Sequence, residues 1–536
     1  MNRERHLRNY GLHSWSGMVL GLFVYVVCFT GSIALFAHEI TSWEDPAKRL
    51  AIPEQPIAID ATFTSWLGEL EDLGEVEFAR IVPPHTMEPF FEGGATVHLK
   101  DSDVHEFITR KWNPVTGDIL PERGEALSVW LLDFHRDLMW PQGLGGRTIG
   151  RTIVGIAGVI LMLSILTGVI AHTKIVREFF TLRYQRSVRL KWQDTHKVLG
   201  LWGLPFYTMI AFTGAVLGVV AILAPLVALL TFKGDQQALI NEVIGEPVEA
   251  SGVPAEMLNI DSLLATTHPE TGKELAFINF NNFGDQNARY DLFFVPNTKL
   301  MSYEAVQIDG VTGDIIPDAS VSAETPGNRA VAMLSPLHYG TFGGMALKLL
   351  YLALGLSLAV ITVFGLMMWI ERRLHGNEGS KSEVFYRRLS HMVAGASMGL
   401  PVATIAIFHL DKLYWGAEAS RMIWTGWTYM IVWALGLAYA FVRKNDYTTT
   451  RELLGLTGVL MIGAAILNTI MTGDTVLNLL TDQHKASAWV DASLMIGGAL
   501  TAAVALKLPS VRQEEKKKTK VKAITTPDVL LEGVAE

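Results

Sequence analysis

Eight apolar stretches constrain this chain more than any other feature of its sequence. A helix of about 20 apolar residues crosses the roughly 30 Å of hydrocarbon in a bilayer. Half of the 536 residues are hydrophobic and only 18% are charged, which is typical of membrane proteins. We therefore predict an α-helical integral membrane protein with eight transmembrane helices. These helices centre on Trp15–Phe36, Ile149–Ala171, Val198–Leu230, Ala346–Ile370, Met392–Phe408, Trp424–Val442, Leu453–Met471 and Ala488–Leu506.

The first stretch has to be read either as a cleaved signal peptide or as a retained anchor. Arg3, Arg5 and Arg8 precede it, but it is too long for a signal peptide, and Ala34-Leu-Phe-Ala37 is a poor cleavage site. We expect a retained anchor. The single cysteine, Cys28, lies inside this stretch and excludes an internal disulfide, a thiolate iron–sulfur cluster and a c-type haem attachment motif.

Lysine and arginine concentrate in the segments after the second, fourth and sixth stretches and in a tail at residues 507–522. Cytoplasmic loops of membrane proteins carry this excess of positive charge, so both termini are predicted to be cytoplasmic. The same charges can bind lipid head groups or nucleic acid. The topological interpretation is favoured, and we expect membrane lipid but no nucleic acid as a partner.

This topology divides the chain into membrane spans, two outer segments and cytoplasmic segments. The predicted boundaries are 1–38 for the N-terminus and first span, 39–145 for the first outer domain, 146–172 for the second span, 173–197 for a basic cytoplasmic loop, 198–230 for the third span, 231–343 for the second outer domain, 344–371 for the fourth span, 372–508 for a cytoplasmic loop and the last four spans, and 509–536 for a basic tail.

Each outer segment has the pattern of a small α+β domain. The first pattern predicts a helix at 59–70 and strands at 76–82, 95–99 and 106–112, and the second predicts a helix at 260–265 and strands at 275–280, 289–295 and 303–309. Both segments end with Val-Thr-Gly-Asp-Ile, at 115–119 and 311–315. Locally this motif is a strand, a tight turn and a strand. Its recurrence at corresponding places favours an internal duplication.

The helices that precede the outer segments repeat a second motif. His13 precedes Gly17 by four residues and Thr30-Gly31 by seventeen, and His196 has the same spacing to Gly200 and to Thr213-Gly214. The repeated unit is therefore helix, outer domain, helix. Because each unit crosses the membrane twice, both copies have the same orientation and are related by a pseudo-twofold axis along the membrane normal. The small residues on these helices allow close packing or leave room for a flat cofactor.

Four histidines occupy corresponding positions in the two copies. His13 and His196 lie at the cytoplasmic edge, and His135 and His338 lie at the outer edge. A single histidine at a helix end is usually only hydrogen-bonded, but two facing imidazoles are what a six-coordinate b-type haem needs. We therefore predict two haems, one for each pair. Zinc or copper is the alternative, although a zinc site gathers its ligands in one small shell rather than at two edges.

Other histidines compete for these roles. His38 and His172 are second-choice ligands, because their counterparts in the other copy are Ala221 and Trp369. His13 and His38 are 25 residues apart, close to seven helical turns, which predicts a shared face of the first helix. His391 and His409 are also placed to share a face of the fifth span, and their role stays open. Arg8, Arg136 and Arg147 are candidate partners of haem propionates.

The sequence has neither a dinucleotide-binding fingerprint nor a P-loop, and Gly143-Leu-Gly-Gly146 lacks the strand and helix that would make it one. No HExxH motif is present, so a metallopeptidase is not supported. We expect electrons to come from a membrane quinol or from a separate reductase rather than from bound NAD(P)H.

These motifs resemble those of the PepSY-associated transmembrane proteins over about residues 8–372. The resemblance rests on the His-x-x-x-Gly helix starts, the Thr-Gly pairs, the Val-Thr-Gly-Asp-Ile turns and the leucine-histidine segments. It implies that the outer domains are PepSY-like and periplasmic. Characterised members include bacterial inner-membrane reductases of iron–siderophore complexes with two b haems, and the resemblance puts haem on His13, His135, His196 and His338. The last four spans resemble an extension found in longer members.

Together the residues and the resemblance predict a multi-pass protein of the bacterial inner membrane. It would transfer electrons outward and reduce a ferric siderophore or another ferric chelate in the periplasm, which promotes iron release. The alternatives are a non-enzymatic PepSY protein that binds a partner protein, and a transporter of iron chelates or metal. For a transporter, the sequence lacks the acidic residue in mid-helix that usually marks an ion path.

Overall fold

The computed structural model describes residues 3–510 except 51–52, 86–88, 101–104, 122–124, 173, 182–187, 245–247, 268–271, 296–299, 301–303, 317–325, 377–378 and 481–484. Most of the predicted basic tail, residues 511–536, therefore lies outside the described residues. The helices are α1 (Arg3–Ala34), α2 (Ala37–Glu44), α3 (Asp60–Glu71), α4 (Ala126–Asp137), α5 (Gly146–Ala171), α6 (Ile175–Glu178), α7 (Val188–Trp202), α8 (Leu204–Thr231), α9 (Gln236–Ile244), α10 (Ile260–Leu264), α11 (Pro326–Tyr339), α12 (Gly344–Gly376), α13 (Lys381–Leu413), α14 (Glu418–Arg443), α15 (Asp446–Thr472) and α16 (Lys485–Lys507).

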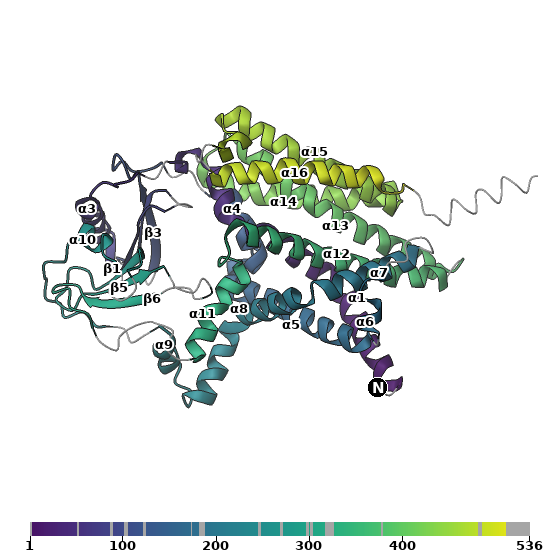
Figure 1. Cartoon of the computed structure of the whole chain (residues 1–536), viewed down its shortest axis with the longest axis horizontal. Helices are drawn as coiled ribbons and strands as arrows, with labels where there is room; N and C mark the ends of the chain where they lie inside the picture. Colours follow the sequence, from purple (N-terminus) through teal and green to yellow (C-terminus); the bar gives the residue numbers. More distant parts are fainter. Residues whose placement is uncertain are drawn as a thin grey trace, which may run out of the picture.

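Eight of the described helices are long and apolar enough to cross a membrane, namely α1, α5, α8 and α12 to α16. This confirms the predicted number of spans and supports a multi-pass membrane protein. Helices α5 and α8 bury few of their residues, as expected for helices that face lipid. Helix α13 is instead central, because it packs against α14, α15 and α12 and 72% of its most apolar stretch is buried. Figure 1 shows α13 to α16 grouped on one side of α1, α5, α8 and α12.

Two helix boundaries differ from the prediction. Helix α1 ends at Ala34, and His38 belongs to the separate helix α2, so the prediction that His13 and His38 share a face of one helix is wrong. The third stretch is likewise divided, with α7 ending at Trp202 and α8 beginning at Leu204. Pro205 stands in the first turn of α8, where its missing N–H has no partner to lose.

The two outer segments contribute to one sheet rather than to two separate domains. Its strands are β1 (Gly74–Val82), β2 (Phe91–Leu99), β3 (His105–Trp112), β4 (Leu275–Asn281), β5 (Arg289–Phe294) and β6 (Glu304–Asp309). The strand order is β3-β2-β1-β4-β5-β6, and every neighbouring pair is antiparallel. Strand β1 of the first segment pairs with β4 of the second, so that Phe78 lies opposite Asn281 and Ile81 lies opposite Ile278.

A single hydrophobic core lies under this sheet. Phe63 and Trp66 of α3 and Ile260 of α10 are buried against residues of both halves, including Ile81 and Phe280. Helices α3 and α10 cover the face of the sheet that is turned away from the long helices (Figure 1). The two helices are also joined directly, because Asp261 accepts hydrogen bonds from the backbone N–H of Ile59 and Asp60.

The repeated Val-Thr-Gly-Asp-Ile motif forms the same turn in both segments. Each turn returns as a single β-bridge to the preceding strand, from Ile119 to Trp112 and from Ile315 to Ile308. Gly117 and Gly313 have positive φ values of 77° and 81°, which residues with a Cβ adopt with difficulty. The turn is therefore a bridge after the strand, shorter than the second strand that the sequence predicted.

Candidate functional site

The four predicted histidines meet as two pairs. The ring centroids of His13 and His196 are 6.0 Å apart with an interplanar angle of 71°, and those of His135 and His338 are 6.4 Å apart with an angle of 17°. The rings come from four different helices, α1, α7, α4 and α11. The structure thus brings together both of the pairs that the sequence motifs singled out, while their role as haem ligands stays a prediction.

Each histidine of the two pairs uses Nδ1 for a hydrogen bond to a neighbouring helix. Nδ1 of His13, His135 and His196 lies 2.8, 3.1 and 3.0 Å from the backbone carbonyls of Ser164, Val27 and Ile361. A carbonyl only accepts hydrogen bonds, so in a neutral ring the proton is on Nδ1. The lone pair is then on Nε2, which is how metal-bound histidines are usually held.

His338 makes the corresponding bond to a side chain. Its Nδ1 lies 2.9 Å from the hydroxyl of Thr213, and this hydroxyl donates to the carbonyl of Met209 at 2.9 Å. The hydroxyl proton is therefore in use, so the ring donates to the hydroxyl oxygen. His338 consequently has the same tautomer as the other three histidines, with Nε2 available.

Each of the four imidazoles packs directly against a glycine, and we call these four glycines the glycine seats. A Cβ built on Gly31 would lie 2.6 Å from Cε1 of His135, and one built on Gly168 would lie 3.0 Å from Cε1 of His13. The corresponding distances are 2.9 Å for Gly214 with His338 and 3.3 Å for Gly365 with His196. These four glycines, two of which belong to the repeated Thr-Gly motif, are therefore needed for ring packing, because any larger residue would meet the imidazole. Figure 1 gives the arrangement of the helices concerned.

Three of these histidines lie outside the eight candidate spans, and all three are partly buried. Burial lowers the pKa of His135 and of His196 to about 4, and that of His338 to about 3. The neighbouring His135 lowers the pKa of His338 further. Near pH 7 these rings are neutral, and a neutral imidazole is the form that donates its lone pair to a metal.

The pair geometry fits a haem iron. An imidazole nitrogen binds a first-row metal ion at about 2.0 Å, so two axial rings on one iron have centroids about 6 Å apart. The observed separations of 6.0 and 6.4 Å agree with this value. With Nδ1 bonded to protein and Nε2 available, His13 with His196 and His135 with His338 are the residues that would hold two b-type haems.

The other candidate histidines differ from the four in their hydrogen bonds and ring partners, although Gly463 packs against Cε1 of His409 as the four glycines do against theirs. His38 is exposed on α2, and His172 at the end of α5 has Nε2 3.9 Å from a carboxylate oxygen of Glu178. His409 bonds through Nε2 to the carbonyl of Leu460 at 2.9 Å, the reverse of the four paired rings. The ring of His391 lies 6.4 Å from that of Phe441.

Two of the arginines proposed as propionate partners already have protein partners. Arg136 forms an ion pair with Asp133, and Arg147 lies 2.8 Å from the other oxygen of the same carboxylate. Arg136 follows His135 at the end of α4, and Arg147 is in the first turn of α5. A propionate at this place would therefore have to share them with Asp133.

Sequence reasoning missed the residues that hold α4, the helix that carries His135. Glu44 of α2 accepts hydrogen bonds from the backbone N–H groups of Leu127 and Ser128 at 2.9 and 3.0 Å, in the first turn of α4. A carboxylate at this position satisfies free N–H groups and complements the helix dipole. A buried acidic residue in an apolar chain was the available signal, but its partner was too far away in sequence to identify.

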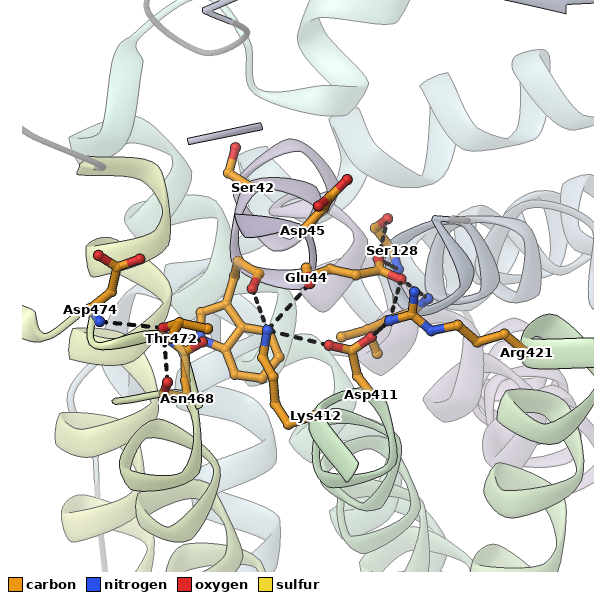
Figure 2. Close-up of polar contacts among 12 residues, drawn as sticks. Ser42, Glu44, Asp45, Ser128, Asp411, Lys412, Arg421, Asn468, Thr472 and Asp474 are labelled. Carbon is orange, nitrogen blue, oxygen red and sulfur yellow. Dashed lines mark hydrogen bonds and ion pairs between the residues drawn. The ribbon is translucent and has the colours of Figure 1, made fainter. Parts of the chain in front are cut away.

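The same carboxylate connects α4 to the C-terminal helices. Arg421 of α14 lies 3.5 Å from Glu44 and forms a buried ion pair with Asp411 of α13 (Figure 2). Lys412 lies 3.4 Å from Asp411 and donates to the carbonyl of Trp43 at 2.6 Å. We call Glu44, Asp411, Lys412 and Arg421 the α2 charge cluster. All four side chains are nearly inaccessible to solvent, so each charge depends on its partners.

The fold and the site together define the class of this protein, a multi-pass membrane protein with two partly buried histidine pairs and a sheet beyond one end of its helices. The chain belongs to the family with a PepSY-associated TM region, which matches residues 10–372 and confirms the resemblance. An uncharacterized protein of Pseudomonas aeruginosa is 28% identical over 330 residues, which are 59% of this chain and 82% of that relative. The family match ends within α12, before helices α13 to α16.

Proposed function

We propose that this protein is a b-type haem protein of the bacterial inner membrane that carries electrons outward and reduces a ferric siderophore or another ferric chelate in the periplasm. The observation that carries the proposal is the common geometry of the four histidines. Each has Nδ1 bonded to a neighbouring helix and Cε1 packed against a glycine, and the two rings of each pair, with centroids 6.0 or 6.4 Å apart, would hold one haem. Haem supplies one-electron chemistry when bound.

The two pairs are separated along the helix axis. Helix α1 provides His13 to one pair and Gly31, the seat of His135, to the other. Eighteen residues separate these positions, which is about 27 Å of helix at 1.5 Å per residue. This length is close to the thickness of the hydrocarbon core, so one pair serves each side of the membrane.

Internal duplication accounts for the matching surroundings of the two halves. His135 packs on Gly31 of α1 as His338 packs on Gly214 of α8, and His13 packs on Gly168 of α5 as His196 packs on Gly365 of α12. In this proposal both halves have the same orientation. The basic segments face the cytoplasm together with the termini, and the sheet faces the periplasm.

The electron donor is a membrane quinol or a separate reductase. A pocket of about 450 Å³ is lined by Tyr10, Trp15, Arg372 and Tyr386 among others. Tyr10 and Trp15 flank His13 in the sequence. Its aromatic and cationic lining at a membrane edge suits a quinol head group. A quinol bound there would deliver its electrons at the cytoplasmic pair and release its protons on the same side.

The substrate is placed at the sheet, near the outer pair. The face of the sheet that α3 and α10 leave uncovered carries Phe277 and Phe293, whose ring centroids are 4.4 Å apart. Arg80 lies 5.8 Å from the centroid of the Phe277 ring. Each turnover transfers one electron to the chelated ferric ion and gives a ferrous ion. Oxygen ligands hold the less charged ferrous ion more weakly, so reduction promotes release.

A reduced-minus-oxidised optical spectrum and the haem-to-protein ratio of the purified protein test this proposal. We expect b-type bands and about two haems per chain, with about one lost in His135→Ala and in His196→Ala. His409→Ala is the matched control, since this buried ring bonds through Nε2 and belongs to neither pair. A colourless protein after expression with sufficient haem would overturn the reductase and leave a partner-binding protein or a transporter.

Substrate reduction is measured separately in membrane vesicles that contain a quinol. We expect a ferric siderophore to yield ferrous iron, detected with a colorimetric ferrous chelator, and His135→Ala to abolish this rate. Haem bands without any reduction of ferric chelates would retain the electron conduit and refute the substrate.

A further inference from the structure

We propose that the outer sheet has a binding site for a divalent transition-metal ion, formed by Glu77, His98 and His105. These residues lie on the three neighbouring strands β1, β2 and β3. Each offers one ligand atom, and the three atoms lie within 4.8 Å of one another. This group is distinct from the four paired histidines between the helices.

The strand register puts both imidazoles on the same side of the sheet. His98 of β2 lies directly opposite His105 of β3, and side chains directly opposite each other on antiparallel strands project from one face. Their rings are stacked, with centroids 4.6 Å apart and an interplanar angle of 21°. Val97, the neighbour of His98, is buried in the core under α3, so the two histidines project from the uncovered face.

A break in the register of β1 supplies the carboxylate. Val76 pairs with Val97 and Phe78 pairs with Thr96, so Glu77 is an extra residue without a partner position on β2. A bulge of this kind redirects a side chain and is often found beside functional sites. The side chain of Glu77 extends across β2 toward β3, and one of its carboxylate oxygens lies 2.9 Å from Nδ1 of His105.

The donor set indicates the kind of ion. Two imidazole nitrogens and one carboxylate oxygen suit zinc, ferrous iron and similar divalent ions, whereas magnesium and calcium prefer oxygen ligands alone. The side chains of His105 and Glu77 are 52% and 40% exposed. An ion bound here would therefore keep coordination positions open to water or to another ligand, and it would exchange with the solvent.

A role follows for this site that rests on the proposed function. Reduction of a ferric chelate releases ferrous iron on the outer side, and the proposed site lies on the same uncovered face of the sheet as Arg80 and Phe277. Two histidines and one carboxylate are a common ligand set for ferrous iron. The site would therefore receive the product ion before it diffuses away.

Zinc binding to the full-length haem-loaded protein in detergent tests the metal site, measured by isothermal titration calorimetry and by elemental analysis after dialysis. We expect Glu77→Gln, His98→Ala and His105→Ala each to weaken the binding of one zinc ion by about tenfold or more. His85→Ala is the matched control, because His85 is an exposed histidine of the same segment outside this group. Unchanged zinc affinity and stoichiometry in all three variants would overturn the proposal.

Two further measurements separate this proposal from the haem proposal. The variants should keep the haem content and the spectrum of the natural protein, which also shows that they are folded. Ferrous iron, added without oxygen, should compete with zinc for the site. Failure to compete would refute the role in receiving product iron, while a colourless protein that still binds zinc at this site would refute only the haem proposal.

Discussion

The helices that carry the histidine pairs and the C-terminal helices α13 to α16 hold their buried polar groups in opposite ways. Around α1, α5, α8 and α12 the buried groups of the site are neutral imidazoles seated on glycine, with Nδ1 bonded and Nε2 left over. At one end of α13 and α14, by contrast, the charges of the α2 charge cluster are matched by each other (Figure 2). The paired imidazoles keep Nε2 for a further ligand, whereas the charges of the α2 charge cluster already have partners in the protein.

This difference indicates that the two groups of helices have different roles. The C-terminal helices lie beyond the family match, yet they contact the helix that carries His135. Trp130 of α4 packs on Tyr429 of α14 with ring centroids 4.2 Å apart, and Glu44 joins the first turn of α4 to Arg421. The C-terminal helices therefore fix α4 in place, while the other helices form the site itself.

The largest effect is expected from Arg421→Met. The substitution leaves the buried carboxylate of Glu44 without its cationic partner and leaves Asp411 with Lys412 alone, which costs about 3–5 kcal/mol of folding stability. Thermal unfolding in detergent measures the loss. Arg443→Met is the control, because the ion pair of Arg443 with Glu452 is exposed and should contribute little. Equal melting temperatures for the two variants would contradict the importance of the α2 charge cluster.

A smaller loss is expected from Glu44→Gln. The amide keeps an oxygen for the first turn of α4 but loses the charge opposite Arg421, which should cost about 2 kcal/mol. If α4 is positioned through this contact, the spectrum of the His135 pair should change while that of the His13 pair does not. A change of similar size in both spectra would refute this specific coupling.

Gly31→Ala tests the glycine seats in the first region. The added methyl group would lie 2.6 Å from Cε1 of His135, and such overpacking typically costs about 1–3 kcal/mol. We expect weaker haem retention at the outer pair, measured as the haem-to-protein ratio after size-exclusion chromatography. Gly17→Ala in the same helix is the control, since nothing lies within 4 Å of its added Cβ. Equal retention in both variants would contradict the role of Gly31.

The smallest effect is expected from Thr213→Val. This change removes the oxygen that accepts the Nδ1–H of His338, which corresponds to about 1 kcal/mol. Thr30→Val is the matched control in the other half, because His135 still has the carbonyl of Val27 at 3.1 Å. We expect a shift in the midpoint potential of the outer haem for Thr213→Val and a smaller one for Thr30→Val. The opposite order would contradict the assigned hydrogen bonds.

Several features could be predicted because they depend on local pattern. Apolar stretches of membrane length predicted the eight spans, strand patterns located the six described strands, and helical patterns located α3 and α10. The repeated spacing from His13 to Gly31 and from His196 to Gly214 also identified which histidines belong together. Repetition was informative because two copies of one motif have to satisfy the same packing.

Other features depended on contacts between distant residues. The pairing of β1 with β4 joins two segments about 200 residues apart, and the alternating pattern of a strand does not specify which strand it pairs with. The end of α1 at Ala34 removed His38 from the face of His13. No local pattern predicted this break, since the residues on both sides of it are apolar or favour helix.

The sequence by itself determined the number of spans, the strands and the four histidines, because hydrophobic periodicity and repeated motifs act over a few turns or residues. Only the tertiary structure decided that Gly31, Gly168, Gly214 and Gly365 each pack against an imidazole, that two segments share one sheet, and that Glu44 and Arg421 tie α4 to the C-terminal helices. These are contacts between residues far apart in the chain. Their geometry depends on how whole helices and strands pack, which no local pattern specifies.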